Sequence, residues 1–124
     1  MLGLEHNTQL RSLFIQENLI KKIEGLDTLQ DLAILNVNDN LLEFVEGLDK
    51  LPKLSTFYAK RNKFGRYKVD GEINNVAALK GLLDCPSIAC LDISDNFIDD
   101  PAIIEEILVK MPNLGVLYSQ GNDF

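Results

Sequence analysis

Apolar residues recur along this chain in a fixed pattern, at the first, fourth and sixth positions of a segment whose ninth position is asparagine. The first copy is Leu10, Leu13, Ile15 and Asn18. Four more copies follow: Leu32, Leu35, Val37 and Asn40; Leu54, Phe57, Ala59 and Asn62; Ile88, Leu91, Ile93 and Asn96; and Leu114, Leu117, Ser119 and Asn122. The asparagines lie 22, 22, 34 and 26 residues apart. Such self-similarity predicts a stack of similar structural units.

This pattern is typical of leucine-rich repeats. The apolar positions of one unit cannot be buried alone, so stacked coils bury them in one continuous core. The middle of each copy favours a short strand, and neighbouring coils pair these strands in parallel. The sequence therefore predicts an α/β fold: a right-handed leucine-rich-repeat solenoid with a parallel sheet on its concave face and short helices and 3₁₀ turns on its convex face. The five strands are expected near Leu13, Leu35, Phe57, Leu91 and Leu117.

The recurring asparagine stands where the chain must turn away from the sheet. Its amide both donates and accepts hydrogen bonds, so it can satisfy backbone groups of its own turn and of the neighbouring coil. We expect a structural ladder, rather than a binding site, formed by Asn18, Asn40, Asn62, Asn96 and Asn122.

The segments after the first two asparagines share a spacing of three between apolar residues. Ile20, Ile23, Leu26 and Leu29 recur at the same offsets as Leu42, Val45, Leu48 and Leu51. A period of three suits 3₁₀ turns or a very short helix on the convex side. Gly25 and Gly47 occupy equal positions and indicate tight local turns.

Two repeats are longer than the others. The surplus of the first is predicted to be a loop at Phe64–Ile73, because it contains two glycines and several charges. Asn75 is expected to cap a helix over residues 76–84 that Pro86 ends.

The second long repeat predicts a helix that begins at Asp100 and Pro101 and ends before Pro112. Its buried stripe is expected to consist of Ile103, Ile104, Ile107 and Leu108. The whole chain, residues 1–124, is expected to be a single domain of about five repeats that lacks a C-terminal cap.

Composition narrows the class of partner. The formal net charge is −7, which argues against a nucleic-acid partner. The basic cluster around Lys60, Arg61 and Lys63, with Arg66 and Lys68 nearby, is interpreted as solvated surface or a protein contact.

No signal peptide and no membrane span is predicted. Cys85 and Cys90 fit neither a disulfide framework nor a zinc site, so both are expected to be reduced thiols in a cytoplasmic protein, with Cys85 in the core.

Strand positions between the core residues point outward, because side chains alternate along a strand. Equivalent outward positions of successive coils are expected to align across the sheet in columns. One column begins at Ser12, the next at Phe14, a third at Gln16 and an outermost one at Glu17. Aromatic residues anchor many protein interfaces. We therefore expect a protein-binding concave face formed by Phe14, Asn36, Tyr58, Lys60, Arg61, Asp92 and Tyr118, although the charges among them have the alternative of pairing with one another across coils.

Signs of catalysis are weak. His6 is the only histidine, and no nucleophile, zinc-protease or phosphate-loop motif occurs. Asp99 with Asp100, and Glu105 with Glu106, are adjacent pairs that do not face each other on a helix. We expect no enzymatic activity, no cofactor and no metal.

Several segments together resemble the leucine-rich axonemal dynein assembly factors. They are Cys85–Pro86–Ser87–Ile88, Leu91–Asp92–Ile93–Ser94–Asp95–Asn96, Asp99–Asp100–Pro101 and Met111–Pro112–Asn113–Leu114, with opening repeats around Leu10–Leu13 and Gln16–Ile20. The resemblance covers nearly the whole chain. It implies a cytoplasmic factor, associated with the cilium or flagellum, that helps assemble dynein arms through contacts with dynein chains or chaperones. The alternative is similarity to the leucine-rich regulatory subunit of protein phosphatase 1, which implies a phosphatase partner; the dynein light chain with leucine-rich repeats is a more distant resemblance.

Overall fold

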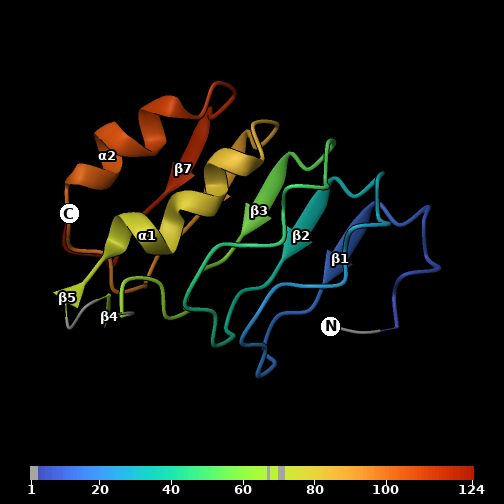
Figure 1. Ribbon diagram of the computed structural model, residues 1–124, viewed down its shortest axis with the longest axis horizontal. Coiled ribbons are helices and arrows are strands. Elements are labelled where there is room, and N and C mark those ends of the chain that lie inside the picture. The colour runs from blue at the N-terminus through green and yellow to red at the C-terminus, as the bar shows by residue number, and fades with distance from the viewer. Residues whose placement is uncertain (1–2, 67, 70–71) are drawn as a thin grey trace.

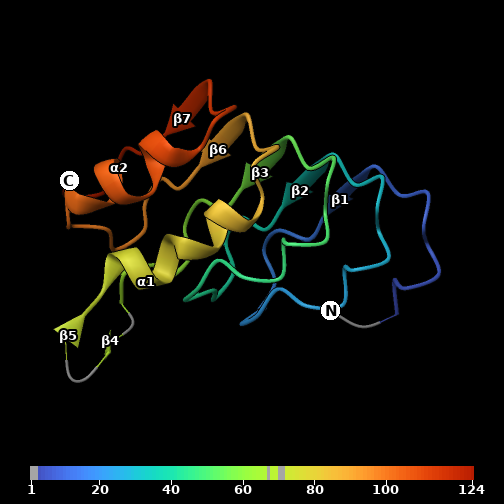
Figure 2. The same cartoon turned by 45° about the horizontal axis from the view of Figure 1, so that its top comes forward.

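A five-stranded parallel sheet organises the molecule. The computed structural model spans the chain and describes residues 3–66, 68–69 and 72–124. The strands are β1 (Ser12–Phe14), β2 (Ile34–Asn36), β3 (Thr56–Tyr58), β6 (Cys90–Asp92) and β7 (Val116–Tyr118), hydrogen-bonded in that order. They form one row from end to end, and the helices cover the opposite side of the coils (Figures 1 and 2). The α/β leucine-rich-repeat solenoid predicted from the pattern is confirmed.

The register of the sheet follows the repeat. Leu13 pairs with Leu35, Leu35 with Phe57, Phe57 with Leu91, and Leu91 with Leu117. In the first four of these strands the middle residue is buried, whereas its two neighbours face outward. All three residues of β7, the last strand, are exposed. Equivalent positions of successive coils therefore lie side by side, which allows outward side chains to be assigned to columns.

The convex side of the first two coils has no regular helix. The backbone N–H of Leu29 donates to the Leu26 carbonyl at 2.9 Å, and that of Leu32 donates to the Leu29 carbonyl at 3.1 Å. Hydrogen bonds between residues three apart form turns of the 3₁₀ type. The second coil repeats this bond from Leu51 to Leu48. These leucines are fully buried or nearly so, and they belong to the same core as the strand leucines. The period of three therefore has the predicted structural role.

The helix predicted over residues 76–84 begins one residue earlier and changes type. Helix α1 (Asn75–Leu79) continues as the 3₁₀ helix η1 (Lys80–Asp84). The capping residue is Asn74, whose side chain accepts from the backbone N–H of Ala77 at 2.9 Å. The predicted cap, Asn75, is wrong: its side chain is buried and accepts hydrogen bonds from the N–H groups of Asp99 and Asp100.

The segment predicted as a loop at Phe64–Ile73 contains secondary structure. Strands β4 (Lys68–Val69) and β5 (Glu72–Ile73) pair antiparallel as a separate hairpin; Tyr67, Asp70 and Gly71 of that segment lie outside the described residues. Phe64 is fully buried in the core, so the segment begins as an anchored turn. In both views β4 and β5 lie near the start of α1, apart from the row of strands (Figures 1 and 2).

The second long repeat forms α2 (Ala102–Glu106) and the 3₁₀ helix η2 (Leu108–Lys110). The helix has Pro101 as its N-cap, one residue after the predicted cap Asp100, whose carboxylate accepts from the Ala102 N–H at 2.9 Å. Ile103, Ile107 and Leu108 are buried, but Ile104 is 42% exposed. The predicted stripe is therefore wrong at Ile104, because Ile103 and Ile107, four residues apart, share the buried face and Ile104 lies beside it.

Candidate protein-binding surface on the concave face

The central outward column of the sheet carries the residues expected to bind a partner. The parallel register places Phe14 beside Asn36, Asn36 beside Tyr58, and so on to the end of the sheet. Asp92 and Tyr118 complete the column. Phe14 is 57% exposed and Tyr118 is 47% exposed, whereas Tyr58 is half-buried. Two large aromatic side chains are thus available to a partner on this face.

Tyr58 has close neighbours within the face. Burial is the main cause that raises the pKa of the Tyr58 phenol. The Cys90 thiol, Tyr118 and Asp92 raise this pKa further. The hydroxyl therefore stays protonated and remains able to donate as well as accept a hydrogen bond. Cys90 is a free, half-buried thiol, whereas Cys85 is a free thiol buried in the core. Asp92 lies directly beside Tyr58 in the register of the sheet, and Tyr118 lies beside Asp92.

The polar residues of the column make local hydrogen bonds. The Asn36 side chain accepts from the N–H of Asn38 at 3.0 Å, and the Asp92 carboxylate accepts from the N–H of Ser94 at 2.9 Å. Both side chains are half-buried. They stabilise the ends of their own strands, which reduces the hydrogen-bonding capacity that they can offer to a partner.

The outermost column does not lie on the strands. Its members Glu17, Asp39, Arg61 and Asp95 have φ between 53° and 58°, and Gly121 has φ of 77°. These residues are in the left-handed region, at the point where each coil leaves the sheet; this conformation costs an ordinary side chain about 1 kcal/mol. Because the left-handed turn redirects the chain, the strand alternation used to place this column outward does not apply to it.

Charges of this column pair across coils. The Arg61 guanidinium contacts both carboxylate oxygens of Asp39 and lies 4.0 Å from a carboxylate oxygen of Asp95. Lys60, by contrast, makes no ion pair among the described residues, although its backbone N–H donates to the Asn38 side chain at 2.7 Å. Arg61 is therefore engaged within the chain, and Lys60 is the cation available on this part of the surface. Ser94, at the position of the next coil that corresponds to Lys60, is buried.

The ion pair predicts a small dependence of stability on pH. The hydrogen bond from Arg61 lowers the pKa of Asp39 below its model-compound value of 3.8, against an opposing effect of burial. A lowered folded-state pKa stabilises the protein above the unfolded-state pKa, and this contribution is lost as pH falls from about 4 through the folded-state value. The Asp39 side chain is 28% exposed, so we expect about 0.5 kcal/mol.

Urea titrations of the wild type and Asp39→Asn at pH 6 and pH 3 measure this contribution. The variant should lose less stability between the two pH values than the wild type does. Asp49→Asn is the control, because Asp49 is exposed and makes no ion pair among the described residues. Identical acid sensitivity in Asp39→Asn and Asp49→Asn would show that the Asp39–Arg61 pair contributes nothing.

The asparagines of the repeat join neighbouring coils. Asn62 donates to the carbonyls of Val37 and Ala59 and accepts from the N–H of Leu42. Asn40, Asn96 and Asn122 make corresponding bonds to the coil before or after them. Asn18 is exposed, and its side chain bonds only to carbonyls of its own turn. The asparagines at positions 40, 62 and 96 are buried, which places them in the framework that holds the coils in register.

One cluster beyond the concave face combines an aromatic ring with two cations. The Lys63 ammonium lies 5.5 Å from the centroid of the Phe97 ring, and the Arg66 guanidinium carbon lies 5.2 Å from it. Lys63 and Phe97 each directly follow a repeat asparagine, so the register alone brings them to equivalent positions of successive coils. The position directly after the repeat asparagine is therefore the sequence signal that indicates the contact of Lys63 with Phe97.

No metal or membrane-spanning feature is found in the described part of the chain. Residues 3–66, 68–69 and 72–124 contain no group of three or more histidine, cysteine, aspartate and glutamate side chains that could hold a metal ion. No helix in those residues is long and apolar enough to cross a bilayer.

Comparison with known proteins gives one partial match in sequence. No model of a known protein family matches the chain. A dynein axonemal assembly factor 1 homolog from Drosophila pseudoobscura pseudoobscura is 42% identical over 50 residues. That match covers 40% of this chain and 3% of the relative, so the chain spans only a small part of that protein.

Solved structures of similar shape cover nearly all of the chain. An internalin (inlF) from Listeria monocytogenes has a TM-score of 0.74 at 20% identity, over 96% of this chain and 31% of its own. A chain of the Drosophila melanogaster SNF/U2A′ complex has a TM-score of 0.70 at 20% identity, over 96% of this chain and 67% of its own. At these identities the likeness concerns the fold alone. The chain therefore has the leucine-rich-repeat solenoid fold.

Proposed function

We propose that this chain is a non-enzymatic scaffold that binds a protein partner on its concave face. The observation that carries the proposal is the row of outward side chains in which Phe14 and Tyr118 are exposed and Tyr58 is half-buried. Exposed aromatic rings gain little from the core, and they bury large areas when a partner covers them. The described strands β4 and β5 lie apart from the row of five strands (Figure 2).

The proposed process is the assembly of ciliary or flagellar dynein arms in the cytoplasm. The partial match to a dynein axonemal assembly factor homolog supports this assignment, together with the resemblance of the repeats and of the segment from Cys85 to Asn122. In that role the partners are dynein chains or the chaperones that fold them. A regulatory subunit of a protein phosphatase has the same kind of repeat and is the function to be distinguished.

Affinity purification of the tagged chain, followed by mass spectrometry, separates the two functions. Dynein heavy chains or chaperones should co-purify with the wild type and should be depleted when Tyr118→Ala is used as bait. A phosphatase catalytic subunit that is recovered instead, with the same dependence on Tyr118, would contradict the assignment to dynein assembly.

Truncation of single aromatic side chains tests the concave face itself. Tyr118→Ala and Tyr58→Ala should each weaken binding of the purified partner by about 1–3 kcal/mol, because interface anchors lose their buried area on truncation. Titration calorimetry measures this change. Leu19→Ala is a matched control, since Leu19 is 80% exposed and lies beyond the end of β1.

The half-buried Tyr58 requires a parallel measurement of stability. Urea unfolding of Tyr58→Ala should show a loss well below the ~3–5 kcal/mol of an aromatic core truncation. Unchanged affinity in both tyrosine variants, or a loss of stability of core size in Tyr58→Ala, would contradict the concave-face proposal.

A further inference from the structure

We propose that a second, basic surface at the edge of the solenoid binds an acidic segment of a partner protein. This basic pocket is lined by Lys21, Leu41, Glu43, Lys63 and Arg66 and has a volume of about 360 Å³. It lies on the turns that follow the strands, so it is separate from the concave column of Phe14, Tyr58 and Tyr118. The two surfaces can be tested independently.

The backbone that carries Lys63 and Arg66 is fixed. The N–H of Arg66 donates to the carbonyl of Lys63 at 3.2 Å, which closes a tight turn. Phe64, inside this turn, is fully buried; its N–H donates to the Asn96 side chain and its carbonyl accepts from the N–H of Phe97. Gly65 has φ of 95°, and a Cβ there would collide with the Phe97 carbonyl, so only glycine fits. The two cations therefore project from a turn anchored in the core.

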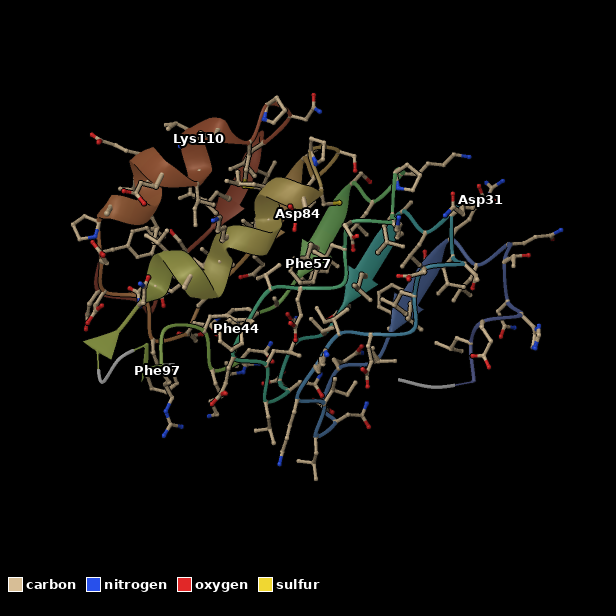
Figure 3. All side chains as sticks on the ribbon, in the orientation of Figure 1. Asp31, Phe44, Phe57, Asp84, Phe97 and Lys110 are labelled. Carbon is tan, nitrogen blue, oxygen red and sulfur yellow. The ribbon has the colours of Figure 1, made fainter. Side chains whose placement is uncertain are left out.

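The Phe97 ring holds both cations near one another. The heads of Lys63 and Arg66 each lie within 5.5 Å of the ring centroid, and cation–π attraction favours this position. The ring is 46% exposed and lies at the edge of the molecule (Figure 3). Like charges held so close reinforce each other's potential, because their separation is about one Debye length or less.

The charges of the pocket are not neutralised by ion pairs within the part of the chain that the structure describes. Lys21, Lys63 and Arg66 make no ion pair among the described residues, whereas Arg61 is paired with two aspartates. The three cations face one carboxylate, Glu43, so the pocket carries a net charge of +2 in a chain whose total is −7. A carboxylate-rich partner complements this charge, and the Arg66 fork can bind one carboxylate through two hydrogen bonds.

The lining of the neighbouring pocket indicates that the acidic segment binds on the Lys21 side of Arg66. That pocket of about 430 Å³ shares Arg66 but is also lined by Phe97, Asp99 and Asp123. Its two carboxylates repel an acidic ligand. The apolar wall at Leu41 in the basic pocket instead suits a segment in which acidic and aliphatic residues alternate.

The test measures fluorescence anisotropy of a labelled peptide of alternating glutamate and leucine. Lys63→Glu with Arg66→Glu should weaken binding by about tenfold or more, because both attractive charges are reversed. Lys50→Glu with Lys110→Glu is the control, since it changes the net charge equally at exposed lysines that make no ion pair in the described residues. Lys110 lies at the opposite edge of the molecule from Phe97 (Figure 3).

Two further variants keep the result interpretable. Lys63→Gln with Arg66→Gln removes the two charges but retains most of the side-chain packing, and it should also weaken peptide binding. This variant replaces the charge reversal if the charge-reversed protein does not fold. Phe97→Ala should weaken binding severalfold while all three cations remain, because the ring positions them.

Equal losses of peptide affinity in Lys63→Glu with Arg66→Glu and in the control Lys50→Glu with Lys110→Glu would overturn the proposal. They would show that only the total charge of the protein affects binding. Unchanged binding in the glutamine variant would also overturn it. Tighter binding of a uridine oligonucleotide or of phosphatidylserine vesicles than of the peptide, lost in the same variants, would replace the acidic peptide by another class of partner.

Discussion

Replacement of Asn62 by alanine is expected to lower the free energy of unfolding by about 3 kcal/mol. The buried N–H of Leu42 would lose the one hydrogen-bond partner that it has among the described residues, which costs about 1–3 kcal/mol in a buried setting. The bonds to the carbonyls of Val37 and Ala59 are lost as well. The Val37 carbonyl retains a bond from Asn40 and the Ala59 carbonyl one from Asn96, so they add less than the orphaned N–H does. Urea denaturation measures the loss.

Asn18→Ala is the matched control within the same repeat position. Asn18 is exposed and bonds only to carbonyls of its own turn, so its removal should cost less than about 1 kcal/mol. Asn62→Asp separates hydrogen bonding from packing, because aspartate fills nearly the same space but cannot donate. It should destabilise at least as much as alanine at neutral pH, since it places a carboxylate against two carbonyl oxygens. Equal effects at Asn18 and Asn62 would show that the links between coils contribute little.

The strands could be predicted from the sequence because one period fixes them. Leucine or a similar residue stands at the centre of each strand, and neighbouring coils repeat the same order of residues. The ends of the helices could not be predicted as well. Asn74 and Asn75 are adjacent and chemically identical, and only the contacts of the folded chain show that the first caps α1 while the second bonds to the distant Asp99.

The exposed positions of the concave face follow from alternation along short strands, and Phe14 and Tyr118 lie where alternation places them. Alternation fails three residues beyond the end of β3, where Arg61 enters the left-handed region and pairs with Asp39. The cluster of Lys63 with Phe97 requires the register across a repeat of 34 residues. A pattern matched on leucines alone does not consider the position after the asparagine, where these two residues stand.

The convex helices also constrain the framework that supports both surfaces. The N–H of Val45 donates to the carbonyl of Ala78 at 2.8 Å, which joins the second coil directly to α1. The backbone of Gly81 passes against the same segment, and a Cβ there would collide with the carbonyl oxygen of Val45. The segment from Asn75 to Asp84 therefore rests on coil backbone rather than on side chains alone.

Gly81→Ala is accordingly expected to destabilise the protein by about 3 kcal/mol. Gly81 lies in η1, where alanine would normally be favoured over glycine by about 0.5–1 kcal/mol. The collision is with backbone, which cannot rotate away, so η1 must shift from the second coil, and overpacking of this kind costs about 1–3 kcal/mol or more. The sign of the effect is thus opposite to that expected from helix propensity.

Gly115→Ala provides the comparison for this prediction. The nearest atom to a Cβ at Gly115 is the Ala89 carbonyl oxygen at 3.9 Å, an ordinary contact. This variant should change the free energy of unfolding by about 0.5 kcal/mol or less. Circular dichroism during urea unfolding of both variants checks the difference. A stabilising effect of Gly81→Ala would mean that η1 does not rest on the Val45 backbone, and that the convex helices adjust freely to the coils beneath them.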